Sequence, residues 1–215
     1  MQNLPFRDRA DAGQLLSHKL KAYTNRLDVL ILALPRGGVP VAREIARSLH
    51  APLDVFLVRK LGAPGQEELA MGAIASGGVR VLNDEVVQAL RIPPHVIELV
   101  TARELRELSR RERLYRDGRP APDAAGKAVI LVDDGLATGS TMRAAIAALR
   151  QTKPKRIVVA VPVAAARTCE ELAEEVDELV CYHTPDPFYS VGFWYEDFSQ
   201  TGDEEIREML ELEKV

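Results

Sequence analysis

The sequence predicts an α/β fold in which a doubly wound, mostly parallel sheet is flanked by helices. Short apolar runs, each suited to one buried strand, alternate with segments whose apolar residues recur at helical spacing. The predicted strands cover residues 28–34, 53–58, 127–132, 156–161 and 179–182. Strands that alternate with helices form βαβ units, which place the strands parallel to one another. The chain has 215 residues, so we expect a single domain over 1–215 with its core in 28–182.

The composition is that of an ordinary globular protein, with 47% hydrophobic and 28% charged residues. A net charge of -4 argues against a general affinity for nucleic acid, because phosphate backbones are bound by clustered Lys and Arg. No apolar run approaches membrane-spanning length, and the first residues lack the apolar core of a signal peptide. We therefore expect a cytoplasmic protein with no nucleic acid and no membrane as partner. We also expect Cys169 and Cys181 to be reduced core residues, since their spacing suggests neither a metal site nor a disulfide framework.

The N-terminal elements follow from local patterns. An opening amphipathic helix that covers the sheet is predicted from apolar residues at helical spacing, namely Leu16, Leu20, Tyr23 and Leu27. The first strand runs into a turn with paired glycines, Gly37 and Gly38, and then into a helix that reaches Leu49. The second strand ends on Arg59 and Lys60.

The middle of the chain contains more polar segments. Glycines at intervals predict an exposed, flexible loop after Lys60, and Ser76-Gly77-Gly78 predicts the turn of a short hairpin, so loop and hairpin together cover residues 61–82. Asn83 is a suitable N-cap for a following helix. Residues 95–116 are rich in Arg and Glu, with pairs at i,i+4, and predict a long, partly exposed helix whose charges are solvated.

The strongest chemical signal follows the strand at residues 127–132. Asp133 and Asp134 end this strand, and a small-residue loop then opens the helix at 140–150. The loop consists of Ala137, Thr138, Gly139, Ser140 and Thr141. Backbone N–H groups at a helix N-terminus favour a phosphate, and two carboxylates at a strand end can accept from ribose hydroxyls or hold magnesium-bound water. A phosphate site beside a diol site indicates a ribose 5-phosphate, and neither a Walker loop nor a dinucleotide fingerprint is present.

The segment from Val129 to Thr141 resembles the binding motif for 5-phosphoribosyl-1-pyrophosphate (PRPP) in type I phosphoribosyltransferases, which consists of a hydrophobic strand, two acids and a Thr-Gly loop. Gly135 departs from this motif, since many members carry an aliphatic residue there. The segment from Ile31 to Gly38 resembles the pyrophosphate loop of the same family. This resemblance implies that Arg36, Gly37 and Gly38 bind pyrophosphate, that the Pro35–Arg36 peptide bond is cis, and that Arg59 and Lys60 supply further cations.

Residues 183–200 resemble, more loosely, the hood that holds the base in this family. The resemblance implies base contacts from Phe188, Tyr189, Val191 and Asp197, whereas the aromatic residues alone would fit a small satellite core equally well. At Ala137 the 6-oxopurine enzymes carry an aspartate that helps to deprotonate the purine. Without it, Glu67 or Glu68 becomes the candidate by position in the predicted loop.

The implied reaction transfers ribose 5-phosphate from PRPP to a nitrogenous base and releases pyrophosphate. The implied catalytic residues are Arg36, Lys60, Glu67, Glu68, Asp133 and Asp134. Mg²⁺ would arrive with PRPP and be reached through water by Asp133 or Asp134, and the family suggests a homodimer. Two alternatives stay open: a non-catalytic regulator that binds PRPP, and a hydrolase or salvage enzyme that acts on another phosphosugar. The residues of the pyrophosphate loop argue against the second. The acceptor base is not predicted.

Overall fold

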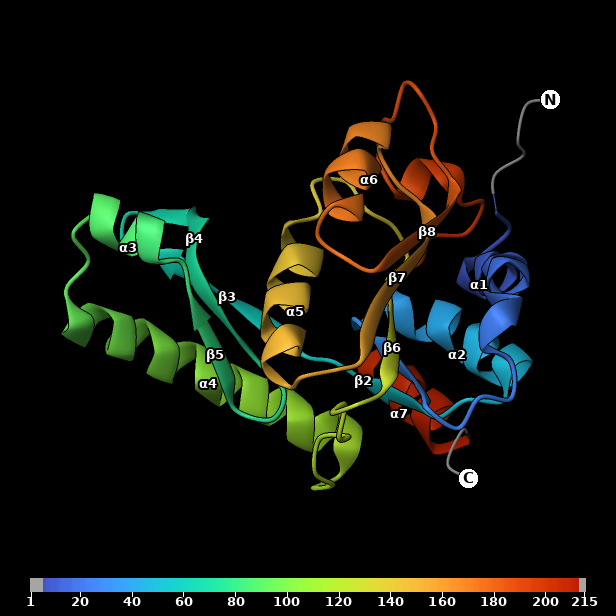
Figure 1. Ribbon diagram of the computed structural model, residues 1–215, viewed down its shortest axis with the longest axis horizontal. Helices are drawn as coiled ribbons and strands as arrows, with labels where there is room; N and C mark the ends of the chain where they lie inside the picture. Colours follow the sequence, from blue (N-terminus) through green and yellow to red (C-terminus); the bar gives the residue numbers. More distant parts are fainter. Residues whose placement is uncertain (1–5, 213–215) are drawn as a thin grey trace. The chain divides into compact units, whose positions relative to one another are not determined.

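The computed structural model describes residues 6–212, apart from the side chains of Glu68 and Leu212. The chain forms two compact units (Figure 1). The larger unit comprises Met1–Val55, Ala124–Gly139 and Lys153–Val215, and the smaller unit comprises Phe56–Asp123 and Ser140–Thr152. The single domain predicted for residues 1–215 stays a prediction.

A five-stranded parallel sheet in the order β2-β1-β6-β7-β8 forms the centre of the larger unit, which confirms the predicted α/β fold. Its strands are β1 (Val29–Ala33), β2 (Leu53–Val55), β6 (Ala128–Val132), β7 (Arg156–Val163) and β8 (Glu178–His183). β1 and β6 are buried at every position and are paired from Val29 with Ala128 to Ala33 with Val132. Because both strands end at the same edge, the segments that follow Ala33 and Val132 leave the sheet side by side.

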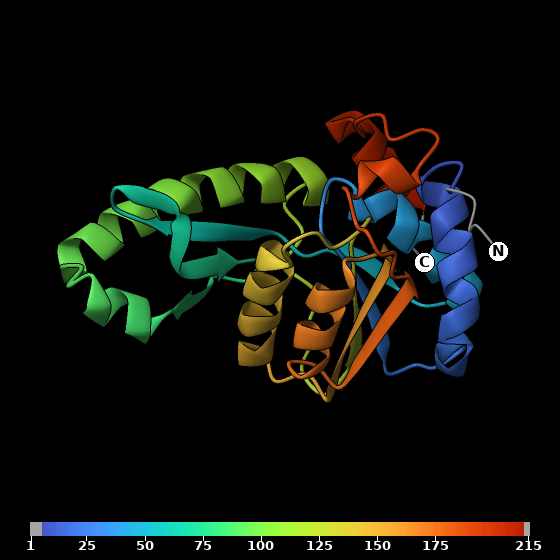
Figure 2. The same cartoon turned by 90° about the horizontal axis from the view of Figure 1, so that it is seen from above.

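Helices cover both faces of this sheet. They are α1 (Arg9–Ser17), the 3-10 helix η1 (His18–Tyr23), α2 (Gly38–Leu49) and α6 (Ala166–Ala173). Near the C-terminus follow the 3-10 helix η2 (Gly192–Trp194) and α7 (Asp203–Leu212), which packs against α2. α1 and α2 pack together on one face, and α6 lies on the other (Figure 2). The opening helix was predicted to extend to Leu27, which is wrong: η1 ends at Tyr23, and Leu27 is fully exposed. The left-handed backbone of Asn25, with φ of 59°, is incompatible with continuation of the helix.

A disulfide joins α6 to β8. Cys169 on α6 and Cys181 on β8 are bonded, although they are only 12 residues apart in sequence. The prediction that both are reduced core residues was therefore wrong. The pairing arises because the chain turns back after α6 and places β8 against that helix, an arrangement that the spacing of two cysteines does not reveal.

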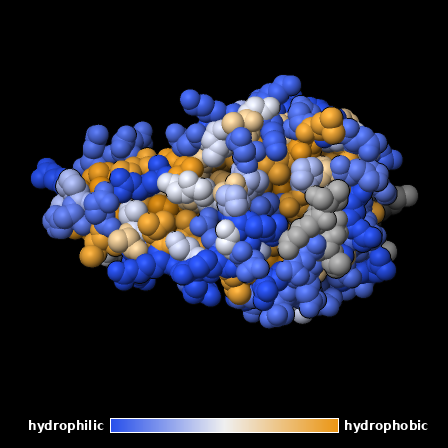
Figure 3. Space-filling view, turned by 90° about the horizontal axis from the view of Figure 1, so that it is seen from below, coloured by the Kyte–Doolittle hydropathy of each residue, from blue (hydrophilic) through white to orange (hydrophobic). Residues whose placement is uncertain are grey.

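The smaller unit contains a three-stranded antiparallel sheet in the order β3-β4-β5. Its strands are β3 (Val58–Ala63), β4 (Gln66–Ala75) and β5 (Val79–Leu82), and its helices are α3 (Asp84–Ala89), α4 (Pro94–Arg116) and α5 (Ser140–Gln151). The hairpin turn at Gly77 and Gly78 is confirmed, and the Asn83 side chain accepts from the Val86 N–H as the predicted N-cap of α3. Apolar side chains lie among charged ones on the surface of this unit (Figure 3). The exposed large apolar side chains of this unit include Leu69, Leu90, Leu99 and Leu105.

Two predictions need correction in this region, one of a strand and one of a loop. Residues 53–58 were predicted as one strand, but β2 and β3 belong to different sheets. The stretch after Lys60 was predicted as an exposed loop, but most of it is β-sheet. Its glycines serve close packing of the backbone, because a Cβ at Gly62 would lie 2.7 Å from the Glu67 carbonyl oxygen and one at Gly72 would overlap the Val81 carbonyl. Between residues 6 and 212, no helix is long and apolar enough to cross a membrane.

Candidate functional site

Two acids lie at the end of β6, in the larger unit. The Asp134 N–H donates to Asp133 Oδ1 over 2.9 Å, and the Asp134 side chain is only 16% exposed. Burial raises the pKa of both carboxyls, and the negative charge of Asp134 raises the pKa of Asp133 further. Such a pair is costly to ionise unless a cation lies close by.

Arg9, at the start of α1, is that cation. Its Nε donates to Asp134 Oδ2 over 2.8 Å, which lowers the pKa of Asp134 and partly offsets burial. Its Nη1 donates to the Ser199 carbonyl over 2.7 Å, and its guanidinium lies 3.9 Å from the centre of the Phe198 ring. Arg9 is 125 positions away from Asp134 in sequence, so sequence reasoning missed it.

The turn after β1 meets these acids. The Pro35–Arg36 peptide bond is cis, which confirms that prediction. A Cβ at Gly37 would overlap the Asp134 carboxylate, and one at Gly38 would lie 2.6 Å from the Val132 carbonyl oxygen. Gly37 has an ordinary helical backbone, with φ of -61°, so glycine is required here for close approach. The structure thus brings together two motifs that the sequence suggested separately.

Arg36 is anchored by a residue that the sequence did not suggest. Its Nε lies 3.0 Å from Oδ1 of Asp203, the first residue of α7. The Arg36 side chain is 39% exposed, so its guanidinium is also accessible to a ligand.

The predicted phosphate loop follows Leu136, whose N–H donates to the Val163 carbonyl. Within it, Ala137 and Thr138 are exposed, and the Thr168 hydroxyl donates to the Ala137 carbonyl over 2.6 Å. Gly139 has a φ of 70°, which favours glycine. In the next part of the chain, Ser140 and Thr141 are exposed in the first turn of α5, and the N-terminus of a helix favours an anion.

Comparison with known proteins identifies the family. Residues 9–193 match the model of the phosphoribosyl transferase domain. The chain belongs to this family. A relative from Mycobacterium tuberculosis that carries phosphoribosyl transferase in its name is 45% identical over 206 residues, which are 96% of this chain and 46% of that protein. The chain therefore spans about half the length of the first curated relatives that it matches.

Two further relatives illustrate the range of the similarity. The crystal structure of TT1426 from Thermus thermophilus has a TM-score of 0.86 and 42% identity, and the match covers 96% of this chain and 98% of TT1426. A protein from Roseiflexus named bifunctional protein PyrR is 35% identical over 137 residues, which are 56% of this chain and 62% of that protein.

Gly135, the departure from the phosphoribosyltransferase motif, has a structural explanation. A Cβ at Gly135 would lie 2.5 Å from Val191 Cγ1 and 3.1 Å from Val163 Cγ1. Val191 therefore occupies the space that an aliphatic side chain at residue 135 would need. Val191 was a predicted base contact, and the structure places its side chain against Gly135, directly after Asp133 and Asp134.

The remaining predicted base contacts lie in different surroundings. Phe188 packs against a buried cluster that includes Phe6 and Tyr195, as the satellite-core alternative suggested. Tyr189 is 68% exposed, and its ring lies 5.1 Å from that of Phe193, which the sequence reasoning did not single out. Asp197 Oδ1 accepts from the Ser199 N–H over 2.9 Å, and this backbone hydrogen bond lowers the pKa of Asp197.

Tyr195 connects the hood to the acids. Its buried hydroxyl donates to the Asp134 carbonyl over 2.6 Å. The pKa of Tyr195 is raised, chiefly by burial and also by the charge of Asp134. The hydroxyl therefore stays protonated and remains a donor to the Asp134 carbonyl.

A cavity of about 560 Å³ lies within the smaller unit. It brings together four predicted site residues from three segments of the chain, namely Arg59 and Lys60, Glu67, and Thr141. α4 also lines it, with Leu99, Arg103 and Glu104 among its residues. The side chain of Glu68, the other predicted acid, lies outside the described part of the structure.

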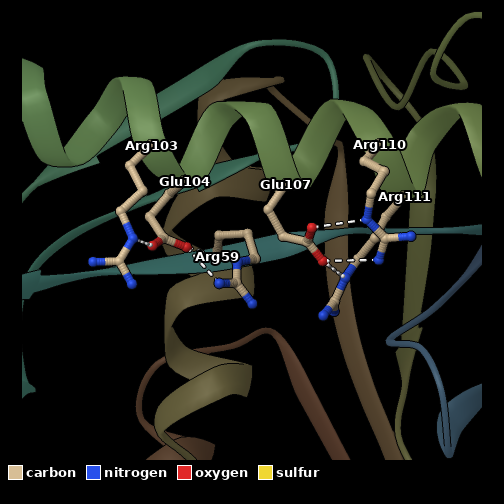
Figure 4. A network of polar contacts seen from close by, with 6 residues as sticks. All are labelled: Arg59, Arg103, Glu104, Glu107, Arg110 and Arg111. Atoms are coloured by element: carbon tan, nitrogen blue, oxygen red, sulfur yellow. Dashed lines mark hydrogen bonds and ion pairs between the residues drawn. The ribbon is translucent and has the colours of Figure 1, made fainter.

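The charges of α4 differ from the prediction in part. The predicted pairs of Glu107 with Arg111 and of Glu112 with Arg116 are confirmed. However, Arg116 is 1% exposed and Glu104 is 8% exposed, so the prediction of solvated charges was wrong at both. Glu104 forms an ion pair with Arg59 on β3, as Figure 4 shows.

Proposed function

We propose that this chain transfers ribose 5-phosphate from PRPP to a nitrogenous base and releases pyrophosphate. One observation supports this above all: the Gly37 turn and the Asp134 carboxylate are in contact at the carboxyl edge of a parallel sheet, where α/β proteins bind their ligands. A pyrophosphate loop in contact with a diol-binding acid suits a ligand that carries both groups on one ribose.

Asp133 and Asp134 accept hydrogen bonds from the ribose hydroxyls in this proposal. Arg9 holds the Asp134 carboxylate, and the Tyr195 hydroxyl holds its carbonyl, so the acid is oriented from two sides. The loop at residues 137–141 binds the 5′-phosphate through the N–H groups that open α5. Positioning of this kind is the main contribution of a protein to a displacement at C1 of the ribose.

Arg36, Gly37 and Gly38 bind the pyrophosphate group, and Arg59 and Lys60 are proposed as further cations. Within residues 6–212, no group of three or more His, Cys, Asp or Glu side chains could hold a metal ion by itself. The chemistry of Asp133 and Asp134 nevertheless fits Mg²⁺, which prefers oxygen ligands, keeps several waters and binds together with phosphates. Held there, Mg²⁺ would supply positive charge to stabilise the departing pyrophosphate.

The base contacts proposed from the hood are Tyr189, Val191 and Asp197, joined by Phe193, whose exposed ring lies beside that of Tyr189. Phe188 and Val191 are partly buried and pack against the cluster that contains Phe6 and Tyr195, so both are weaker candidates than the exposed Tyr189. Glu67 and Glu68 are proposed to assist deprotonation of the base. A cytoplasmic location and a homodimer also remain proposals.

The test is a calorimetric titration with PRPP, with and without Mg²⁺, followed by assays of pyrophosphate release with a panel of purine and pyrimidine bases. We expect binding that depends on Mg²⁺ and release with one base. Asp134→Asn should weaken PRPP binding without unfolding the protein. The control Glu196→Gln removes an exposed charge and should leave PRPP binding unchanged. Binding without release from any base would favour the regulatory alternative, and absence of PRPP binding would refute the proposal.

A further inference from the structure

The Arg59–Glu104 pair in the smaller unit carries an inference about α4. Glu104 is 8% exposed, although α4 is otherwise rich in exposed charge. A buried carboxylate is costly unless it is paired and hydrogen bonded. A helix that kept its charges only for solubility would not place one of them inside.

The geometry directs one oxygen of this carboxylate, Oε2, at Arg59. Arg59 donates from Nε and from Nη2 to Oε2 of Glu104, over 2.8 and 2.5 Å. Oε1 of Glu104 lies 3.5 Å from Nε of Arg103 (Figure 4). A guanidinium has five N–H donors, so two bonds to one oxygen fix its plane and leave donors for a ligand.

Arg59 is held where a ligand can reach it. It lines the cavity of about 560 Å³ together with Lys60 and Thr141, and its side chain is 32% exposed. A long side chain in such a place would otherwise occupy many rotamers, which an anion would have to order on binding.

We propose that Glu104 is a positioning residue, which fixes the Arg59 guanidinium in the orientation that binds the pyrophosphate group of PRPP. This inference rests on the proposed function. It also assigns a role to α4, whose sequence lies outside the motifs that resemble phosphoribosyltransferases: the helix supplies the buried acid that orients a ligand-binding cation.

α4 also provides a matched control. Glu107 forms ion pairs with Arg110 and Arg111, whereas Arg59 forms its ion pair with Glu104 (Figure 4). Glu107→Gln removes the same charge from the same helix as Glu104→Gln. Loss of a negative charge should by itself strengthen the binding of an anion, whereas loss of Arg59 orientation should weaken it. The two causes therefore have opposite signs.

The experiment is a titration of wild type, Glu104→Gln and Glu107→Gln with PRPP and Mg²⁺, with thermal melting of each protein alongside. We expect Kd for Glu104→Gln to rise about tenfold, and Kd for Glu107→Gln to stay within about twofold of wild type or to fall. In an Arg59→Met background, Glu104→Gln should have almost no further effect on Kd, because its action passes through Arg59.

Each contrary result is distinct. If wild type binds PRPP and Glu104→Gln binds equally well, or if the effects of Arg59→Met and Glu104→Gln simply add, the positioning role is refuted while the proposed function stands. If wild type binds no PRPP, both are refuted. Should Glu104→Gln fail to fold, Arg59→Lys tests the same contact, since Lys keeps the charge but lacks the planar fork. Unchanged PRPP affinity in Arg59→Lys would then overturn the inference.

Discussion

Gly37→Ala tests why a glycine occupies the turn after β1. Local backbone preference and close packing against Asp134 predict opposite effects of this change on stability. Gly37 precedes α2 with φ of -61° and ψ of -33°, a backbone that alanine adopts without strain. Backbone entropy alone therefore predicts a gain of about 0.4–1 kcal/mol in the free energy of unfolding. The structure predicts the opposite sign, because the added methyl group would overlap the carboxylate of Asp134.

The size of the expected loss in stability follows from the contacts that the added methyl group would disturb. Overpacking costs about 1–3 kcal/mol. Displacement of the Asp134 carboxylate also breaks its 2.8 Å hydrogen bond from Arg9, and a hydrogen bond to a charged group contributes about 1.5–3 kcal/mol. With the entropic gain subtracted, the expected net loss is about 2–5 kcal/mol.

Urea unfolding of wild type and variant at pH 7, with midpoint and slope fitted together, measures this loss. Gly202→Ala is the control, since a Cβ at Gly202 would meet no atom within 4 Å and should change stability by less than about 0.5 kcal/mol. A Gly37→Ala protein at least as stable as wild type would refute the close approach of the turn to Asp134.

Three further predictions concern the acids and the disulfide. Arg9→Met should lower the free energy of unfolding at pH 7 by about 3–5 kcal/mol, because the buried Asp134 carboxylate loses its cation. Urea unfolding at pH 7 and at pH 5 should show a smaller loss of stability at pH 5. Burial raises the folded-state pKa of Asp133 above its ordinary value of 3.8, so the folded protein binds more protons and wild-type stability falls as pH rises through that interval. Asp133→Asn should accordingly be more stable than wild type at pH 7 in metal-free buffer, with the difference vanishing near pH 4; a difference independent of pH would contradict this assignment. Cys169→Ser opens the crosslink to Cys181, whose sequence separation is 12, and should cost about 3 kcal/mol by urea unfolding, with dithiothreitol giving a similar loss in wild type.

The parallel sheet could be predicted because its signal is local. β1 and β6 are buried at every position, and strands of that kind are continuous apolar runs in sequence. The antiparallel sheet of the smaller unit escaped prediction for the opposite reason. Gly62 and Gly72 suggest a loop when taken alone, and only the neighbouring strand explains why a side chain is excluded there.

The candidate site shows the same division. Arg36, Gly37, Asp133 and Asp134 lie in short motifs beside strand ends, so the sequence suggested them. The residues that hold this site, and the partner of Arg59, lie in no such motif. Arg9, Asp203 and Glu104 are charged residues on helices with other charges beside them in sequence, and each acquires its importance from contacts across the fold. Charged residues are common on helices, and nothing local distinguishes these three.

The segment from Tyr195 to Asp203 has a consequence for how new acceptor specificities could evolve. It lies beyond the residues that match the family model, yet it supplies the hydroxyl on the Asp134 carbonyl, the carbonyl that accepts from Arg9, and the carboxylate on Arg36. Under the proposed function, exchange of residues 183–203 with those of a relative would therefore alter the proposed PRPP-binding residues together with the proposed base contacts. Adaptation to another base would then proceed through single changes at exposed positions such as Tyr189 and Phe193, while the residues from Tyr195 to Asp203 stay constant.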